Sequence, residues 1–512
     1  MAGDVRILTA PGEQLELPEE YRPLMCLYSD GRFLVAKTHL ESPYTRSLAA
    51  RAVRLGYQVE KIPSDIETIR KSYEISSGEG SHKKQAFDTT KMQKDVTDLL
   101  IRGFHARASD IHIRVSKREH TSVWMRIMGD LTFKEEHSYD YGERLCSTIY
   151  MAMADIADTA FKPLERQDAR MAGGDKLPSG LHGVRIATTP QVDGFLMVMR
   201  LLYNDTSDGE TLDLTKLGYT DTHSKAIQTM KDRPTGINII AGPTGSGKST
   251  TLQRIIVSYL RERHNRIHVI TVEDPPEYPL KGAVQTPVVA DSPEGRSRAF
   301  SAAISAAMRL DPDTIMIGEV RDKTSAKLAV QAAMTGHQVW TTVHANDAMG
   351  IMDRMIDLLR DTENPNPLDL IADPTIISGL ICQRLSKVIC PKCKVKLTDK
   401  EADLDPELMQ RVRTAVANVD NVYVRGDGCE SCNHSGIKGR SALAEVVAPD
   451  LAFMLLLKKG DKFGAKDYWR TRMNGKTLVE HAIMKVEAGI VDPGMAEETV
   501  GPLIVGELGG GD

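Results

Sequence analysis

The sequence predicts an α/β fold in which helices wrap a parallel sheet. From Thr215 to about Gly379, short apolar stretches alternate with segments of helical periodicity, the pattern of parallel strands joined by crossover helices. Polar and acidic residues follow the carboxyl ends of these stretches, where open α/β sheets bind ligands. The expected strands are Ile237–Ile240, Val269–Val272, Ile315–Ile317 and Val339–Val343. A chain of 512 residues has room for this unit and for about two or three further domains.

The first of these strands is followed by a glycine-rich loop that fits G-x-x-x-x-G-K-[ST]. The helix expected over Thr250–Arg263 comes next, so loop amides and a helix N-terminus can together bind phosphate oxygens. Lys248 is expected to reach the β/γ-phosphates, and the Ser249 hydroxyl a Mg²⁺ ion. The alternative is a turn without a ligand, but composition gives only about 0.02 chance matches in such a chain. The expected nucleotide-binding residues are Gly242, Pro243, Thr244, Gly245, Ser246, Gly247, Lys248, Ser249 and Thr250.

Composition excludes several classes of protein. Lys+Arg 65 against Asp+Glu 70 gives a net charge of −5, so no overall positive field attracts nucleic acid. We find no secretory signal pattern and no apolar run near the ~20 residues of a membrane span. The 7 cysteines, without an export signal, indicate a reducing compartment in which paired cysteines more often bind metal. These features predict a cytoplasmic protein that is at most peripheral to a membrane.

Acidic residues follow the second and third expected strands. Glu273 opens the segment EDPPE, whose carboxylates would repel phosphate unless they act through Mg²⁺ or polarise water. Glu319 follows the strand Ile315–Ile317, where an acid holds the water shell of the metal or orients the attacking water. The alternatives are a helix-capping acidic loop at Glu273 and a simple ion pair between Glu319 and Arg321. The sequence does not rank Glu273 against Glu319 as the catalytic base.

Two histidines flank the fourth expected strand. His337 precedes Val339–Val343 and His344 follows it, and we expect both side chains near the same edge of the sheet. There they could sense a γ-phosphate by hydrogen bonding. The alternative is that each histidine is structural.

In this order the four segments resemble the conserved motifs of the secretion ATPases. GPTGSGKST, TVEDPPE, RLDPDTIMIGEVRD and TGHQVWTTVHAND resemble the Walker A motif, aspartate box, atypical Walker B motif and histidine box of that family. Its members are the motors of type II secretion, type IV pili and related type IV systems. The resemblance extends from Val96 to Gly489. It implies a RecA-like phosphate-loop ATPase core, a preceding PAS-like α+β domain, and a ring of six subunits.

The resemblance also assigns arginines upstream of the core. Residues 108–112, ASDIH, are similar to a motif of the second N-terminal domain of the family. By that resemblance Arg185 and Arg200 reach the nucleotide phosphates from this domain, with Arg126 as a third candidate. Arginine suits phosphate because its guanidinium forms paired, charge-assisted hydrogen bonds. The alternative is that these arginines are surface or ion-paired residues.

Two C-x-x-C pairs near the C-terminus predict a metal site. Two tight turns can place four thiolates at the corners of a tetrahedron around Zn²⁺, and four protein ligands make such a site structural. A redox pair is the alternative, and His434 is an alternative ligand. A tetracysteine subdomain followed by KGRSALAEVV resembles the assembly motors of the family, whereas retraction motors typically lack it. The expected ligands are Cys390, Cys393, Cys429 and Cys432, and the expected buried thiols are Cys26, Cys146 and Cys382.

Polar stretches at Ser76–Thr90 and Asn204–Asp213 predict linkers between domains. The expected domains are residues 1–90 (partner docking), 91–205 (α+β, with the arginines), 206–385 (ATPase core), 386–445 (zinc) and 446–512 (helical). The expected function is an ATP-hydrolysing hexameric motor, peripheral to the inner membrane, which assembles a type IV pilus or type II secretion pseudopilus through a platform protein and does not bind nucleic acid directly. The alternatives are a retraction motor, a DNA-transfer ATPase of a conjugation system, and a nucleotide-binding scaffold without turnover. The sequence does not identify the machine.

Overall fold

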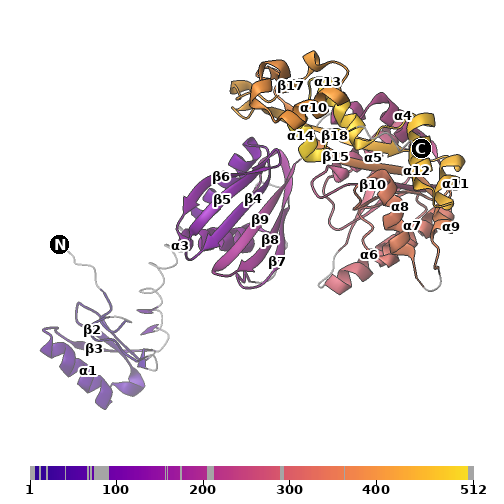
Figure 1. Ribbon diagram of the computed structural model, residues 1–512. Helices are drawn as coiled ribbons and strands as arrows, with labels where there is room; N and C mark the ends of the chain where they lie inside the picture. The colour runs from indigo at the N-terminus through magenta and orange to yellow at the C-terminus, as the bar shows by residue number, and fades with distance from the viewer. Residues whose placement is uncertain are drawn as a thin grey trace.

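The fold comprises three parts that follow one another along the chain (Figure 1). In this computed structural model the described residues are 6–10, 13–18, 21–22, 24–40, 42–65, 68–69, 72–73, 91–155, 157, 160–172, 176–203, 213–288, 293–361 and 364–504. The first predicted linker lies outside the described residues, as does the second except for Asp213. Within the described part of the chain, no helix is both long and apolar enough to cross a membrane.

The N-terminal part is a three-stranded sheet covered by one helix. Strands β1 (Met25–Leu27) and β2 (Arg32–Ala36) pair antiparallel, and β3 (Glu60–Ser64) joins β2 in parallel. Helix α1 (Pro43–Arg54) begins after Ser42, whose hydroxyl accepts a hydrogen bond from the Thr45 amide. Its apolar face packs on the sheet through Leu48 and Ala52.

The middle part is an α+β unit with a six-stranded antiparallel sheet in the order β6-β5-β4-β9-β8-β7. The strands are β4 (Ala108–Ser116), β5 (His120–Ile127), β6 (Asp130–His137), β7 (Gln167–Ala172), β8 (Leu181–Gln191) and β9 (Gly194–Tyr203). A helix over residues 91–105, helix α3 (Tyr139–Thr148) and the turn Ile149–Met153 pack against it. Strands β6 and β7 were not expected, because β6 is an edge strand with little buried surface and β7 is short.

The third part confirms the predicted α/β class. Its seven-stranded sheet has the order β12-β11-β13-β14-β10-β15-β18, and every neighbouring pair is parallel except β15 and β18. The strands are β10 (Gly236–Ala241), β11 (Val269–Glu273), β12 (Ala283–Pro287), β13 (Thr314–Ile317), β14 (Gln338–Val343), β15 (Ile377–Ile389) and β18 (Ile437–Val447). The central strands are buried on both faces, which explains their continuous apolar sequences.

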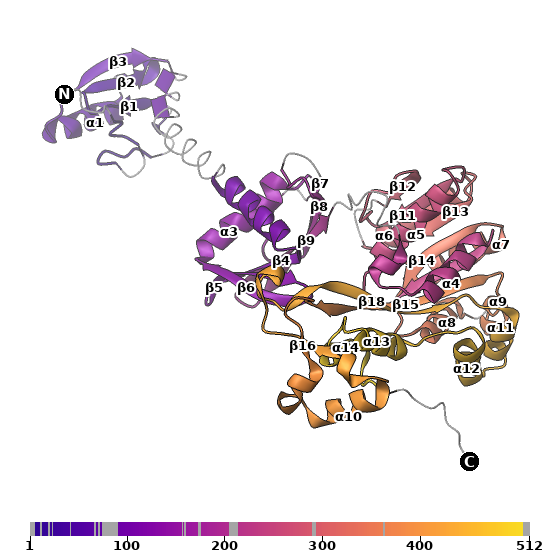
Figure 2. The ribbon, with the colours of Figure 1, turned by 90° about the horizontal axis from the view of Figure 1, so that it is seen from above.

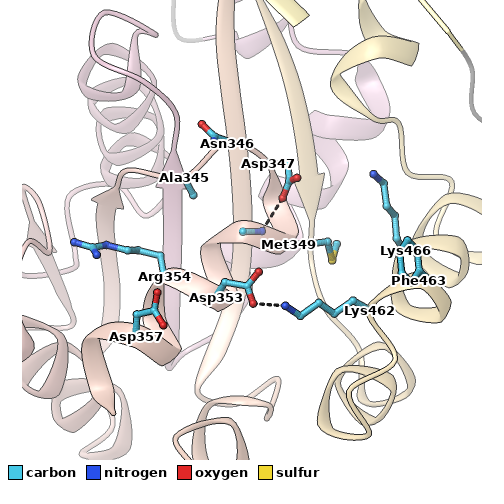
Figure 3. A pocket seen from close by; sticks show the side chains of 11 residues that line it. Ala345, Asn346, Asp347, Met349, Asp353, Arg354, Asp357, Lys462, Phe463 and Lys466 are labelled. Carbon is cyan, nitrogen blue, oxygen red and sulfur yellow. Dashed lines mark hydrogen bonds and ion pairs between the residues drawn. The ribbon is translucent and has the colours of Figure 1, made fainter. Parts of the chain in front are cut away.

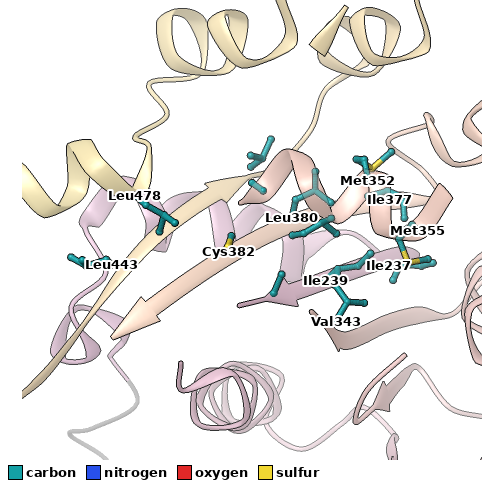
Figure 4. Close-up of a cluster of buried hydrophobic side chains, with 14 of the residues drawn as sticks. Ile237, Ile239, Val343, Met352, Met355, Ile377, Leu380, Cys382, Leu443 and Leu478 are labelled. Carbon is teal, nitrogen blue, oxygen red and sulfur yellow. The ribbon is translucent and has the colours of Figure 1, made fainter. Parts of the chain in front are cut away.

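Helices cover both faces of this sheet. One face packs on α6 (Pro293–Ala307), α7 (Lys323–Met334) and α8 (Ala348–Leu359). The opposite face packs on α4 (Asp221–Asp232) and α5 (Lys248–Glu262). Figure 4 shows the first of these cores, in which side chains of β10, β14 and β15 meet Met352 and Met355 of α8. The short helix α9 (Leu368–Ile371) precedes β15.

Strands β15 and β18 extend beyond the rest of the sheet. The last residue of β10, Ala241, pairs with Cys382, whereas β15 and β18 remain paired out to Ile389 and Ile437. We call residues 383–389 with their partners 437–444 the arm. Figure 2 shows it extending from the core sheet to the middle part, where the Lys387 ammonium lies 2.8 Å from the Asp130 carboxylate of β6.

The cysteine-bearing segment is an insertion at the tip of the arm. Residues 390–436 contain β16 (Val395–Lys396), α10 (Pro406–Ala415) and β17 (Tyr423–Val424). Of the expected zinc domain, 386–445, residues 386–389 lie on β15 and residues 437–445 lie on β18, and these two antiparallel strands flank the insertion. After β18 the described residues form α11 (Leu451–Lys458), α12 (Lys462–Arg472), α13 (Leu478–Glu487) and α14 (Pro493–Val500).

Candidate functional site

The parallel strands bring four predicted segments to one edge of the core sheet. Since β10, β11, β13 and β14 run in the same direction, their carboxyl ends lie together. The phosphate loop follows β10, Glu273 ends β11, Glu319 follows β13 after one glycine, and His344 follows β14. The fold thus collects at one edge residues that are separated by up to about a hundred positions in the sequence.

The phosphate loop turns through glycines in the left-handed region. Gly245 and Gly247 have φ of 79° and 83°, which only residues without a β-carbon adopt readily. Helix α5 begins directly after Gly247, and among the described residues no side chain caps it, so its first amides are available to an anion. The Lys248 ammonium folds back over the loop and donates to the Gly242 and Pro243 carbonyls at 2.8 and 3.2 Å.

Glu319 lies among basic side chains beside this loop. One carboxylate oxygen is 3.1 Å from Nε2 of His344, and the other accepts from Nε of Arg321 at 2.8 Å. Burial lowers the pKa of Lys248, and the negative charge of Glu319 is the largest influence that opposes this shift. Glu319 does form the ion pair with Arg321 that was considered as an alternative to a catalytic role. It also lies close to Lys248 and His344.

Glu273 has a different environment. It is buried, and its Oε1 accepts from the Thr271 hydroxyl at 2.7 Å and from the Gln285 amide at 2.9 Å. Burial raises the pKa of Glu273, and these two hydrogen bonds oppose the shift. Both donors come from the sheet, so they fix the carboxylate in place at the end of β11.

The expectation that both histidines lie at this edge is wrong for His337. Gln338 pairs with Gly236, the first residue of β10, so His337 lies at the opposite end of the strands from the phosphate loop. Its Nδ1 is 3.1 Å from the Ala332 carbonyl at the end of α7. A strand spans about 3.3 Å per residue, so the six residues of β14 separate the two histidines by about 20 Å.

This separation predicts different effects for the two histidines on nucleotide affinity. His344→Ala should reduce the preference of the protein for ATP over ADP by about tenfold or more, the effect of losing one hydrogen bond to a charged phosphate. His337→Ala should leave the ratio of the two affinities at the value of the parent. Titration of both variants with fluorescent ATP and ADP analogues measures these ratios, and an equal loss in both variants would contradict the placement.

Arginines form a row across the sheet of the middle part. Arg126, Asp110, Arg200, Arg185 and Arg170 are successive cross-strand neighbours on β5, β4, β9, β8 and β7, so their side chains share one face. Asp110 is buried and accepts from Nε of Arg200 at 2.9 Å, while Nε of Arg126 lies 4.0 Å away. The aspartate of the ASDIH motif therefore holds Arg200 in the row.

Arg185 joins this row to the core. Its guanidinium lies 3.9 Å from the carboxylate of Glu277, which belongs to the acidic loop after β11. Burial lowers the pKa of Arg185, and the charge of Glu277 opposes the shift. Since Glu277 also acts on the pKa of Lys248, Arg185 and Lys248 face the same region from two different parts of the chain.

Arg170 was not among the predicted site residues. Its strand, QDARMA, is too short and too polar to show alternation, and only the register opposite Arg185 reveals that it belongs to the row. Arg296 was also missed, and its Nε lies 3.8 Å from the carboxylate of Asp274 in the acidic loop. Neither arginine lies in a recognisable motif, so the sequence gave no indication that either belongs to the site.

The residues at this edge fit Mg²⁺. The ion prefers oxygen ligands and retains several waters, and the Ser249 hydroxyl in the first turn of α5 and the Glu319 and Glu273 carboxylates at neighbouring strand ends supply such oxygens. When bound with a nucleotide, the ion would neutralise phosphate charge.

The four predicted cysteine ligands lie together, and their sulfur atoms are all within 4.8 Å of one another. The Cys390–Cys429 and Cys393–Cys432 sulfur pairs are 3.9 Å apart. A tetrahedron with Zn–S bonds of about 2.3 Å has sulfur atoms about 3.8 Å apart, so the cluster fits zinc. Among the described residues, His434 is not part of this group. Cys26, Cys146 and Cys382 are buried thiols, as predicted.

A surface hollow of about 510 Å³ adjoins the phosphate edge between α8 and α12 (Figure 3). It begins at Ala345, one residue after His344, and extends to Phe463 and Lys466. The Lys462 ammonium forms an ion pair with Asp353 within it. Acidic and basic side chains are mixed along its lining, so the hollow favours neither anionic nor cationic ligands.

This edge can bind a nucleoside triphosphate and direct a water molecule at its terminal phosphate, chemistry that defines a phosphate-loop ATPase. Residues 85–500 match the family described as "Type II/IV secretion system protein". The chain belongs to that family, and it is an ATPase.

Individual relatives agree with this assignment. The chain is 33% identical over 404 residues to the type II secretion system protein E of Dickeya dadantii, which covers 77% of this chain and 73% of the relative. It is 30% identical over 513 residues to the type IV pilus assembly ATPase PilB of Thermus thermophilus, covering 94% of this chain and 54% of the relative. The crystal structure of the ATPase DotB of Legionella pneumophila has the same fold, with a TM-score of 0.54, 22% identity, and coverage of 78% of this chain and 93% of that chain.

Proposed function

We propose that this chain is an ATP-driven motor that assembles a type IV pilus or the pseudopilus of a type II secretion system. One observation carries the proposal: the phosphate loop and an arginine of a separate part of the chain face the same acidic loop, at the 3.9 Å contact between Arg185 and Glu277. A site shared between two parts closes when nucleotide binds and opens after turnover, and such closure is a movement that can do work.

Within this site, each group has a proposed role. The loop amides and Lys248 hold the phosphates, and Ser249 binds the magnesium that accompanies them. Glu319 orients the attacking water, since it lies near Lys248 and contacts His344. We assign Glu273 a structural part in this site, because two sheet donors fix it.

Charge explains why nucleotide binding would draw the two parts together. A triphosphate beside Lys248 places several negative charges opposite Arg185 and Arg200. Arginine stabilises phosphate more strongly than it stabilises the single carboxylate of Glu277, because several charge-assisted hydrogen bonds form. The guanidinium of Arg185 would therefore exchange Glu277 for phosphate, and hydrolysis would weaken the new contact.

The tetracysteine cluster supports assembly over retraction, because the resemblance places this subdomain in the assembly branch. We propose that it binds structural zinc at the tip of the arm. The proposed partners are further copies of this chain in a hexameric ring and an inner-membrane platform protein, which would place the chain peripherally at the inner membrane. The relatives include both a type II secretion protein and a pilus assembly ATPase, so the proposal covers both machines.

Deletion of the gene tests the proposal. We expect loss of surface pili or of exported proteins, restored by the parent gene and not by a copy that encodes Lys248→Ala. Excess pili on deletion would instead indicate a retraction motor. Loss of conjugative DNA transfer together with DNA-stimulated turnover would indicate a DNA-transfer ATPase. If pili, secretion and DNA transfer are all unchanged, the proposal is wrong.

A further inference from the structure

A buried glutamine supports the phosphate loop from the neighbouring strand. Gln383 follows Cys382, the residue of β15 that pairs with the end of β10, and its side chain is 1% exposed. Its amide nitrogen donates to the carbonyl of Ser246 in the loop at 2.6 Å. This contact joins residues 137 positions apart, and no motif of the sequence pointed to it.

The hydrogen bond controls the direction of one loop amide. The Ser246 carbonyl and the Gly247 N–H belong to the same trans peptide unit, in which they point in opposite directions. Since Gln383 holds the carbonyl toward β15, the N–H of Gly247 is turned away from the sheet, to the side on which a phosphate binds. Amides presented in this way are the main donors of a glycine-rich phosphate loop.

A tyrosine fixes the orientation of this glutamine. The buried Tyr219 hydroxyl donates to Oε1 of Gln383. A carbonyl oxygen can only accept, so the nitrogen of the side-chain amide must face Ser246 and its oxygen must face Tyr219. The two hydrogen bonds therefore permit one orientation of the amide.

The loop glycines allow the close approach that this contact needs. A β-carbon on Gly242 would lie 2.3 Å from the backbone oxygen of Gln383. A β-carbon on Gly247 would lie 3.2 Å from the side-chain amide nitrogen of Gln383. Any larger residue at Gly242 would push the loop away from β15. The close contact between the loop and β15 therefore depends both on the loop glycines and on the side-chain amide of Gln383.

We propose that Gln383 is a positioning residue that sets the nucleotide affinity of the phosphate loop, with Tyr219 holding its amide in place. The inference rests on the nucleotide binding that the proposed function also requires. It also links the phosphate loop to the arm, because β15 continues from Gln383 to Ile389, the residue before Cys390. A displacement of the arm would therefore reach the loop through this hydrogen bond.

The test replaces the amide by groups that cannot donate. In Gln383→Met and Gln383→Leu, the dissociation constants for ATP and for ADP should both rise about tenfold or more, the effect of a misdirected hydrogen bond to a charged ligand. The ratio of the two constants should stay unchanged, because the lost amide does not distinguish the nucleotides. KM for ATP should rise by the same factor, with a smaller change in kcat. Tyr219→Phe should give an effect in the same direction and smaller.

Gln338 provides a matched control in the same sheet. It is also 1% exposed, and its amide donates to the backbone carbonyls of Met230 and Lys231 at 3.2 Å and of Arg233 at 2.5 Å, but it begins β14 at the opposite end of the strands. Gln338→Met should lower the melting temperature in the manner of Gln383→Met and leave both nucleotide affinities unchanged. The inference is overturned if both Gln383 variants bind nucleotide like the parent, or if Gln338→Met weakens binding equally. A parent that binds no ATP would instead overturn the proposed function as well.

Discussion

Glu319→Gln should lower ATP turnover by about 100-fold to 10,000-fold, the range typical of a lost general base. Glutamine has the same shape as glutamate and can still accept from Arg321, but it cannot draw a proton from water. Nucleotide affinity should be retained or increased, since the substitution removes a negative charge that acts on Lys248 beside the phosphate site. Phosphate release and equilibrium binding of a fluorescent ATP analogue measure the two effects separately.

The matched control is Glu273→Gln. The neutral side chain keeps an oxygen that can accept from Thr271 or Gln285, so the end of β11 should retain its position. We expect Glu273→Gln to lose at least tenfold less turnover than Glu319→Gln. The loss of a general base lowers turnover by about 100-fold or more, which sets this difference. A larger loss in Glu273→Gln would assign the water-orienting role to Glu273.

Removal of the metal should unfold the insertion between β15 and β18 and spare the nucleotide site. We expect one zinc per chain in the parent and none in Cys390→Ser with Cys429→Ser. Metal binding contributes about 10–16 kcal/mol to the folding of small zinc sites, more than residues 390–436 could replace with their own core. Zinc content by elemental analysis and proteolytic cleavage within 390–436 are the measurements. ATP affinity should remain at the value of the parent, because β15 and β18 pair with each other from Gln383 to Ile389 and hold the arm in place without the insertion.

The control for this prediction is Cys26→Ala. Cys26 is a buried thiol of the N-terminal part, so its replacement leaves the four-sulfur cluster intact. Zinc content and the proteolytic pattern of residues 390–436 should be unchanged. A parent without zinc whose cysteines form disulfides after purification under reducing conditions would contradict the structural-metal assignment and favour a redox role.

Several features could be predicted because they depend on neighbouring residues. The phosphate loop is contiguous, and its glycines, its lysine and the helix that follows identify it without knowledge of distant contacts. Glu319 was also predictable, since the end of an apolar stretch in an alternating α/β pattern marks the ligand-binding edge. The spacing of the two C-x-x-C pairs was enough to predict a metal site.

The sequence misplaced His337 because the direction of a strand decides which edge of the sheet a residue reaches. His337 and His344 are close in sequence, yet the strand between them runs from one end of the sheet to the other, so only His344 reaches the phosphate edge. Strand pairing also decides where the cysteine-bearing segment sits, because β15 and β18 pair with each other on both sides of the insertion.

The sequence by itself determined the chemistry of this protein: a phosphate loop, an acid at a strand end and four cysteines spaced for metal. Only the tertiary structure decided which side chains share the site. Arg170 joins the arginine row through strand register, and Gln383 directs a loop amide from a strand 137 residues away. The physical reason is that periodicity and spacing act over a few residues, whereas cross-strand neighbours are chosen by the order in which strands pair.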